Sequence, residues 1–377
     1  VASTIANDAP DAFAEALRYP AELDAILQRD YSDRFHDPKR RPAHSRRLDA
    51  LSLFTSTWLL LGLYLDGWAH NHIAELETFF TPWHAVLYSG FFSVALLLSF
   101  TQYRGVARGY AWSRALPLGY GWSLLGVIVF FIGGVGDMIW HELFGIEQGL
   151  EALFSPTHLL LAAGGVLFVA GPLRAAWSRT GLRGWRDLYP VVITAAILLS
   201  LFTFFMQYAS IFSTPSALVM RPSGSSTYFV EATNVFSILA PTGLTIGVLL
   251  FLLRRWQLPF GAATFIFTVN GLLMLLMRFD FASPYWRIVV AAGLGGLLAD
   301  VLIARLQPSL TRVTSLRLIA FAVPCVTFLL IFAALAMTRG RGLWWPIHMW
   351  LGVPVVAGAV GLGLSFLLAP PPVPAEP

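Results

Sequence analysis

The sequence predicts an all-α protein, a polytopic transmembrane helix bundle of about ten spans with both termini in the cytoplasm. Three observations predict it. Of the 377 residues, 56% are hydrophobic and only 12% are charged, whereas a soluble domain carries about 25% charged residues. Apolar runs of about 18 or more residues recur, and each can cross a hydrocarbon core about 30 Å thick. Basic residues, finally, are concentrated in alternate connections between these runs.

The two ends of the chain are polar and lie outside the predicted spans. Residues 1–50 mix acids with bases and lack the apolar core of a signal peptide, so they predict a cytoplasmic segment with a polar helix over 10–30. Residues 370–377 are rich in proline and predict a disordered tail.

Ten apolar segments fill the rest of the chain. Their approximate bounds are 51–68, 82–101, 119–139, 156–173, 188–207, 233–253, 261–277, 284–304, 315–337 and 346–368. The first four carry the polar motifs described below. We therefore expect a four-span metal-site half over 51–175 and an additional six-span bundle over 176–369.

The 25 Lys and Arg residues predict the orientation. Twenty lie in the N-terminal segment, at Arg317 or near the connections 102–118, 174–187, 254–260 and 305–314. The opposite connections hold the other five, which are Arg221, Arg278, Arg287, Arg339 and Arg341. Because Lys and Arg collect on the cytoplasmic side, the end that carries the twenty is expected to be cytoplasmic. The expected location is the plasma (inner) membrane. The connections 66–84 and 137–158 then face the extracytoplasmic side.

Single residues exclude some classes of site. The one cysteine, Cys325, allows neither an internal disulfide nor a cysteine-based metal cluster. The one lysine, Lys39, precedes the first span, so no span offers a lysine for a retinal Schiff base. No nucleic-acid partner is expected.

The stretch "DGWAHNHIAELETFFTPWH" joins the first two spans and holds a candidate metal site. Asp66 and His70 are four residues apart, so a helix places both on one face. Thr81 can cap the next helix, with Pro82 at its first position and His84 in its first turn. Because consecutive spans are antiparallel neighbours, the end of one and the start of the next share a membrane depth. Asp66, His70 and His84 are therefore expected to converge.

The stretch "DMIWHELFGIEQGLEALFSPTH" repeats this pattern between the third and fourth spans. Asp137 and His141 each follow their counterparts by 71 positions, and His158 stands after Ser155 and Pro156 as His84 does after Thr81 and Pro82. This correspondence predicts an internal repeat and a second triad. A fainter echo, "LWWPIH", ends at His348 but has no Asp-x3-His partner before it.

Two imidazoles and one carboxylate suit copper, zinc or non-haem iron and leave coordination positions open. A lone histidine at a membrane boundary more often makes only hydrogen bonds, but ionisable groups at membrane depth tend to be functional. Here three of them recur in the same order in two copies. His72 is expected behind the ligands or on the loop surface. The neighbouring acids are expected to be solvated, to attract cations or to relay protons; they are Glu75, Glu77, Glu142, Glu147 and Glu151. Asp300 and Arg305 are interpreted as a local ion pair.

At these residues the sequence resembles the C subunit of the copper membrane monooxygenases, the particulate methane, ammonia and short-alkane monooxygenases. The shared pattern is Asp-x3-His followed by an acidic-Thr-x-Phe-Thr-Pro-x-His stretch and a tyrosine. Its positions in this chain are Asp66, His70, Glu77, Thr78, Phe80, Thr81, Pro82, His84 and Tyr88. The likeness covers about residues 50–175. It implies copper at Asp66, His70 and His84 and a second copper at Asp137, His141 and His158.

The resemblance further implies an enzyme, a copper-dependent monooxygenase subunit that hydroxylates a small apolar substrate or ammonia with O2. Such a protein needs companion membrane subunits and an electron donor. The main alternative is a non-enzymatic protein for copper or zinc handling or for oxidase assembly. A proton-coupled transporter using Asp66 and Asp137, and a haem protein with two histidine ligands, are further alternatives.

Overall fold

The computed structural model describes residues 40–73, 79–145, 149–220, 224, 226–280, 283–338 and 343–370. The helix predicted over 10–30 and the tail from residue 371 lie outside this part of the chain. The described residues form an all-helical fold without β-strands. Its helices are α2 (Arg46–His72), α3 (Pro82–Ala107), η1 (Trp112–Arg114), α4 (Gly121–Phe144), α5 (Glu151–Phe154), α6 (Pro156–Val169), α7 (Gly171–Trp177), α8 (Gly184–Phe205), η2 (Gln207–Ala209), α9 (Ser216–Val219), α10 (Thr227–Leu253), α11 (Ala262–Leu276), α12 (Trp286–Leu306), α13 (Val313–Ala336) and α14 (Ile347–Leu368).

Every apolar segment predicted from the sequence is helical. Within the described residues, eight helices are long and apolar enough to cross a membrane; they are α2, α3, α4, α8, α10, α12, α13 and α14. The segment 156–173 forms α6 and α7, which are bent by 42° at their junction and make a ninth span if they are counted together. The chain is thus a multi-pass membrane protein by the length and composition of its helices.

The seventh predicted span, 261–277, forms the short helix α11. Its 15 residues extend about 22 Å at 1.5 Å per residue, less than the hydrocarbon core. The Asp300 carboxylate of α12 caps this helix, because it accepts hydrogen bonds from the backbone N–H of Ala263 and from both the N–H and the hydroxyl of Thr264. The ion pair predicted between Asp300 and Arg305 is absent from the described residues, so that interpretation was wrong.

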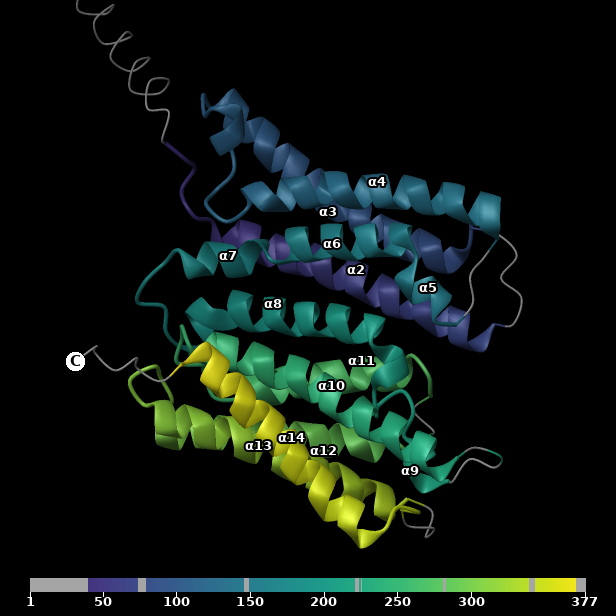
Figure 1. Ribbon diagram of the computed structural model, residues 1–377. Helices are drawn as coiled ribbons and strands as arrows, with labels where there is room; N and C mark the ends of the chain where they lie inside the picture. The colour runs from purple at the N-terminus through teal and green to yellow at the C-terminus, as the bar shows by residue number, and fades with distance from the viewer. Residues whose placement is uncertain are drawn as a thin grey trace, which may run out of the picture.

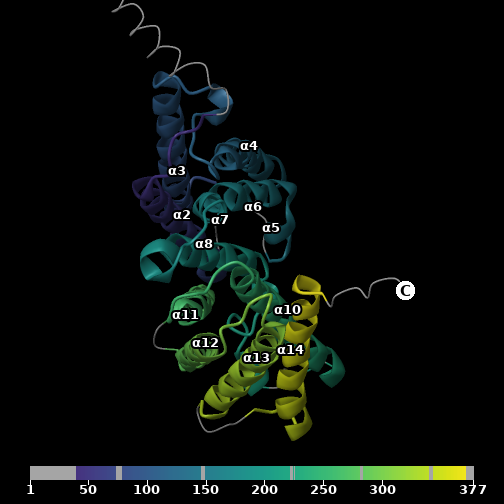
Figure 2. The ribbon, with the colours of Figure 1, turned by 90° about the vertical axis from the view of Figure 1, so that its left-hand side faces the viewer.

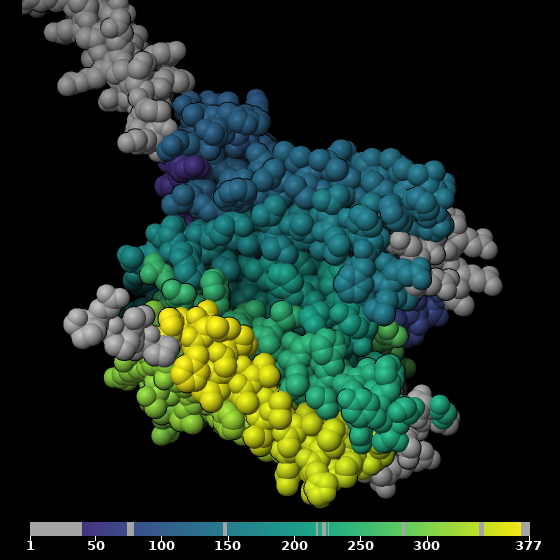
Figure 3. All heavy atoms as spheres, viewed as in Figure 1, coloured from purple at the N-terminus to yellow at the C-terminus, as the bar shows by residue number. Residues whose placement is uncertain are grey.

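The helices run side by side along one direction, so that connections gather at two ends of the bundle (Figure 1). The triad end is where α2 ends and α3 begins, and the basic end is where α2 begins and α14 ends. Helices α2 to α7 form one layer and α10 to α14 the other (Figure 1); the space-filling view shows the blue and teal atoms above and the green and yellow atoms below (Figure 3). Helix α8 lies between the layers and contacts α2, α6 and α7 on one side and α10 and α11 on the other (Figure 2).

Glycines bring the helices of each N-terminal hairpin into close contact. A Cβ at Gly62 of α2 would lie 2.7 Å from the Leu87 Cα of α3, and a Cβ at Gly164 of α6 would lie 2.5 Å from the Phe130 N of α4. Small residues of this kind let membrane helices approach at the backbone. The close approach places the end of each first helix beside the start of its partner, where the histidines lie.

Candidate metal centre

In the first hairpin, α2 ends and α3 begins close to where the sequence predicts. Helix α2 continues through Asp66 and His70 to His72. Thr81 caps α3 by accepting a hydrogen bond from the His84 N–H at 3.1 Å, and Pro82 occupies the first position of the helix. Asp66 and His70 therefore lie one turn apart in α2, and His84 faces them from the first turn of α3.

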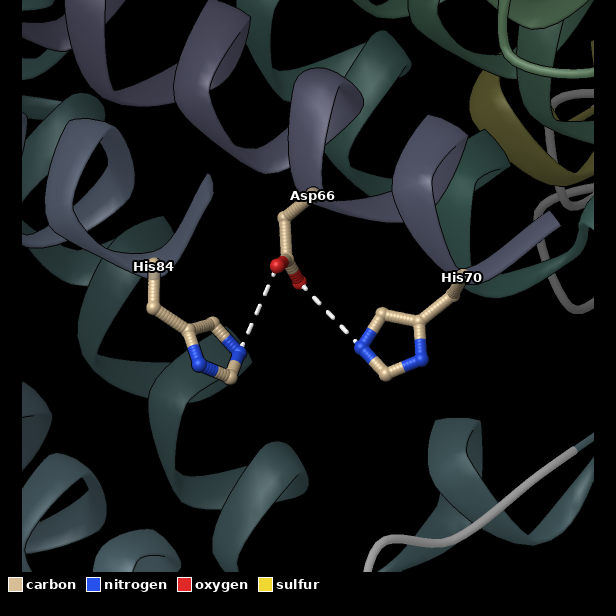
Figure 4. A group of neighbouring side chains, drawn as sticks. All are labelled: Asp66, His70 and His84. Atoms are coloured by element: carbon tan, nitrogen blue, oxygen red, sulfur yellow. Dashed lines mark ion pairs between the residues drawn. The ribbon is translucent and has the colours of Figure 1, made fainter. Parts of the chain in front are cut away.

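These three side chains converge. The two carboxylate oxygens of Asp66 face different rings: Oδ1 lies 3.3 Å from His84 Nε2, and Oδ2 lies 3.8 Å from His70 Nε2 (Figure 4). Three such ligand atoms all lie within 4.8 Å of one another. Ligands at about 2.1 Å from a tetrahedral metal are about 3.4 Å apart. The spacing thus fits a single ion between them.

The second triad has nearly the same geometry. Asp137 and His141 lie one turn apart at the end of α4, and Ser155 caps α6 by accepting from the His158 N–H. Asp137 Oδ1 lies 3.3 Å from His158 Nε2, and Oδ2 lies 3.7 Å from His141 Nε2. The structure therefore brings together the residues of each predicted triad.

Hydrogen bonds at the other ring nitrogen show which atom is free to bind a metal. His84 Nδ1 lies 2.6 Å from the Phe79 carbonyl, and His141 Nδ1 lies 3.3 Å from the Gly145 carbonyl. A carbonyl only accepts, so each Nδ1 carries a proton. Each Nε2 then faces a carboxylate oxygen, at 3.3 Å for His84 and 3.7 Å for His141, and a positive charge between the two atoms, either a ring proton or a metal ion, makes this contact favourable. A metal ion supplies such a charge, and ligating histidines commonly donate their second N–H in this way.

The surroundings of the two carboxylates differ. The Asp137 side chain is 2% exposed and Oδ1 accepts a hydrogen bond of 2.9 Å from the Thr157 hydroxyl. The Asp66 side chain is 13% exposed, and its contacts among the described residues are with His70 and His84. The second carboxylate is thus buried and held by a hydroxyl, while the first is more open.

Both triads line one cavity of about 400 Å³ near the triad end. The rings of His84 and His141, one from each triad, have centroids 6.5 Å apart, and the Phe79 ring packs against both. Tyr88 also contacts His84 and lines the cavity. The rest of the lining is mainly apolar and includes Leu59, Leu87, Phe130, Leu161, Leu201 and Phe204.

The C-terminal half contributes to this cavity, which the sequence motifs do not indicate. Gln207 and Tyr208 follow α8, and Arg278 follows α11; all three line the cavity. One signal in the sequence could have indicated Arg278. It is one of only five basic residues in the connections at this end.

Other predicted polar residues lie apart from the triads. His72 is exposed, with its ring stacked on Trp68 and its Nδ1 2.8 Å from the Trp68 carbonyl. His348 is exposed at the start of α14 and belongs to no metal-like group among the described residues. Glu142 and Glu151 are exposed. Four residues of the predicted motifs lie outside the described residues; they are Glu75, Glu77, Thr78 and Glu147.

Comparisons with protein-family models, with curated proteins and with solved structures find no match for this chain. The fold and the two triads therefore stand on their own geometry. Together they define a multi-pass helical membrane protein with two Asp/His/His groups in one cavity.

Proposed function

We propose that this protein binds two copper ions, one at Asp66, His70 and His84 and the other at Asp137, His141 and His158. The observation that carries the proposal is the convergence of two Nε2 atoms and one carboxylate in each triad, with Nδ1 of His84 and of His141 turned to a backbone carbonyl. Each triad offers two nitrogens and an oxygen and leaves further positions open. Zinc and non-haem iron are the alternative metals for such a ligand set.

The reaction we propose is the O2-dependent hydroxylation of a small substrate, by a component that resembles the C subunit of a copper membrane monooxygenase. The likeness of residues 66–88 to that family supports it, and so does the apolar cavity that both triads line. Copper bound there would supply the activation of O2. The protein's own contribution is to hold each ligand set in place, to exclude water through the apolar lining, and to bring the substrate beside the triads. Companion membrane subunits and an electron donor would complete the system.

The same proposal includes a topology. Ten spans, with α6–α7 and the short α11 each crossing, would leave both termini in the cytoplasm. The triads would then lie at the extracytoplasmic face of the plasma (inner) membrane. The concentration of Lys and Arg at the basic end supports this orientation. The equal spacing of the two triads supports an internal repeat.

The second candidate function is metal handling without catalysis, either copper or zinc storage or delivery during oxidase assembly. The observation that favours it is the placement of both triads at one end of the bundle. A translocation path would need ligands through the membrane depth. Among the described residues, groups of side chains that could bind a metal occur only at the triad end. Delivery fits this arrangement better than transport.

Metal analysis and copper spectroscopy on wild type, His84→Ala and His158→Ala test the proposal. We expect two copper ions per chain in the wild type and one in each variant, with different spectra for the two remaining sites. Full occupancy in both variants would refute the ligand assignment. With companion subunits and reductant present, an O2-dependent product from a small organic substrate or ammonia separates the enzyme from the metal-handling protein, which would yield none.

A further inference from the structure

Arg278 places a positive charge in the cavity that both triads line, and it is not a proposed ligand of either triad. It follows the last residue of α11 and its cap Met277, and it lines the same cavity as Asp66 and Asp137. Basic residues are rare in the connections of the triad end. An arginine beside two candidate metal sites therefore calls for a separate explanation.

Contacts at the end of α11 hold this position close to the first triad. The Asn71 side chain of α2 donates hydrogen bonds to the Met277 carbonyl at 3.5 Å and to the Gly67 carbonyl at 2.7 Å. A Cβ at Gly67 would lie 3.1 Å from the Met277 Sδ, so the two chain segments are in close contact. Arg278 is thus anchored beside the turn of α2 that carries Asp66 and His70.

The Arg278 guanidinium has no ion-pair or hydrogen-bond partner among the described residues. Two other arginines do have partners: Arg174 donates to Gly119, Ser123 and Leu167, and Arg287 donates to the Met337 carbonyl at 2.9 Å. Arg278 is exposed at the surface and also lines the cavity, where partial desolvation lowers its pKa from the ordinary value. A guanidinium keeps its charge in proteins, so it favours an anion that enters the cavity.

We propose that Arg278 is the anion subsite of this cavity and that its ligand is a monocarboxylate with a short apolar chain. The planar guanidinium matches a carboxylate through two parallel hydrogen bonds, and the apolar lining receives the chain next to the triads. A volume of about 400 Å³ lies within the range of small-molecule sites. The inference rests on the proposed function and deepens it, because it makes the substrate an acid whose C–H bonds face the two metal sites.

Binding of hexanoate to purified full-length protein loaded with Zn²⁺, a redox-inert ion, tests this without turnover. Calorimetry is run on wild type, Arg278→Gln, Arg278→Lys and Arg287→Gln, the last a matched loss of charge outside the cavity. Arg278→Gln is expected to weaken hexanoate binding by about 10-fold or more. Arg278→Lys is expected to give an intermediate value and Arg287→Gln the wild-type value. 1-Hexanol, which has no charge, should bind all four alike.

Three results would overturn the proposal: hexanoate affinity unchanged in Arg278→Gln, an equal loss in Arg287→Gln, or affinity that does not rise with chain length from acetate to octanoate. The zinc content of each protein is measured beside the binding. Wild-type protein without zinc would count against the proposed function, whereas wild-type zinc content with hexanoate binding that ignores Arg278 would count against this inference alone.

Discussion

The two triads have the same ligands at nearly the same distances, but their surroundings are different. The difference begins in the sequence, where Trp83 precedes His84 and Thr157 precedes His158. Thr157 donates its hydroxyl hydrogen to Asp137, which is buried, while Asp66 accepts no such bond from a described side chain and is more exposed. The same ligand geometry thus occurs once with a buried, hydrogen-bonded carboxylate and once with a more exposed carboxylate.

The largest expected effect comes from removing either carboxylate. Asp66→Ala and Asp137→Ala should each abolish one metal site, with more than about a 100-fold loss of affinity, since losing even an outer partner of a ligand costs 10–100-fold. The other site should keep its metal. Metal titration with elemental analysis measures this, and His72→Ala serves as the control because His72 faces away from the triads. Loss of both metals in either variant would mean that the sites are not separate.

A smaller and one-sided effect is expected from Thr157→Val. The change keeps the shape of the side chain but removes the hydroxyl that holds Asp137. Affinity at the second site should fall about 10-fold, and the first site should be unchanged. Titration of Asp66→Ala with and without Thr157→Val isolates the second site. An unchanged affinity there would show that the hydroxyl does not set the difference between the triads.

The open and buried carboxylates also predict different rates of metal release. On addition of a chelator, the metal should leave in two phases, with the faster one from the site of Asp66, whose side chain is more exposed than that of Asp137. Stopped-flow absorbance on the loaded protein measures both phases. His84→Ala should lose the fast phase and His158→Ala the slow one; the reverse assignment would contradict the comparison.

The smallest expected effect is that of His348→Ala. His348 shares the Pro-x-His spacing with both triads, but it is exposed at the start of α14 and has no ligand partners among the described residues. Metal content and affinity should equal those of the wild type. A measurable loss of metal in the same titration would place a third site in the C-terminal half.

Local features of the site were predictable from the sequence, because they depend on short-range geometry. Asp-x3-His fixes two ligands on one helix face, and a Thr-Pro or Ser-Pro start fixes where the next helix begins. The structure places Asp66, His70 and His84 together as expected. The same holds for the second hairpin.

The long-range features were not predictable in this way. The two triads share a cavity because Phe79 packs against both His84 and His141 and because Tyr88 fits against Gly134 of α4. Such packing between hairpins leaves no spacing pattern in the chain. The contribution of Arg278 from the other layer is of the same kind.

The interpretation of Asp300 shows how a local rule fails. Residues five apart on a helix point about 140° away from one another, so Asp300 and Arg305 do not meet. Asp300 instead satisfies the start of α11, which belongs to a different part of the sequence. The helix that Asp300 caps is α11, which is shorter than a membrane span.

The most direct test of the two-site account is the position of copper in crystals of the loaded protein, found by anomalous scattering at the copper edge. We predict two peaks, each about 2 Å from the Nε2 atoms and a carboxylate oxygen of one triad. Copper bound elsewhere, or no peak at either triad in protein that carries copper by elemental analysis, would contradict the account.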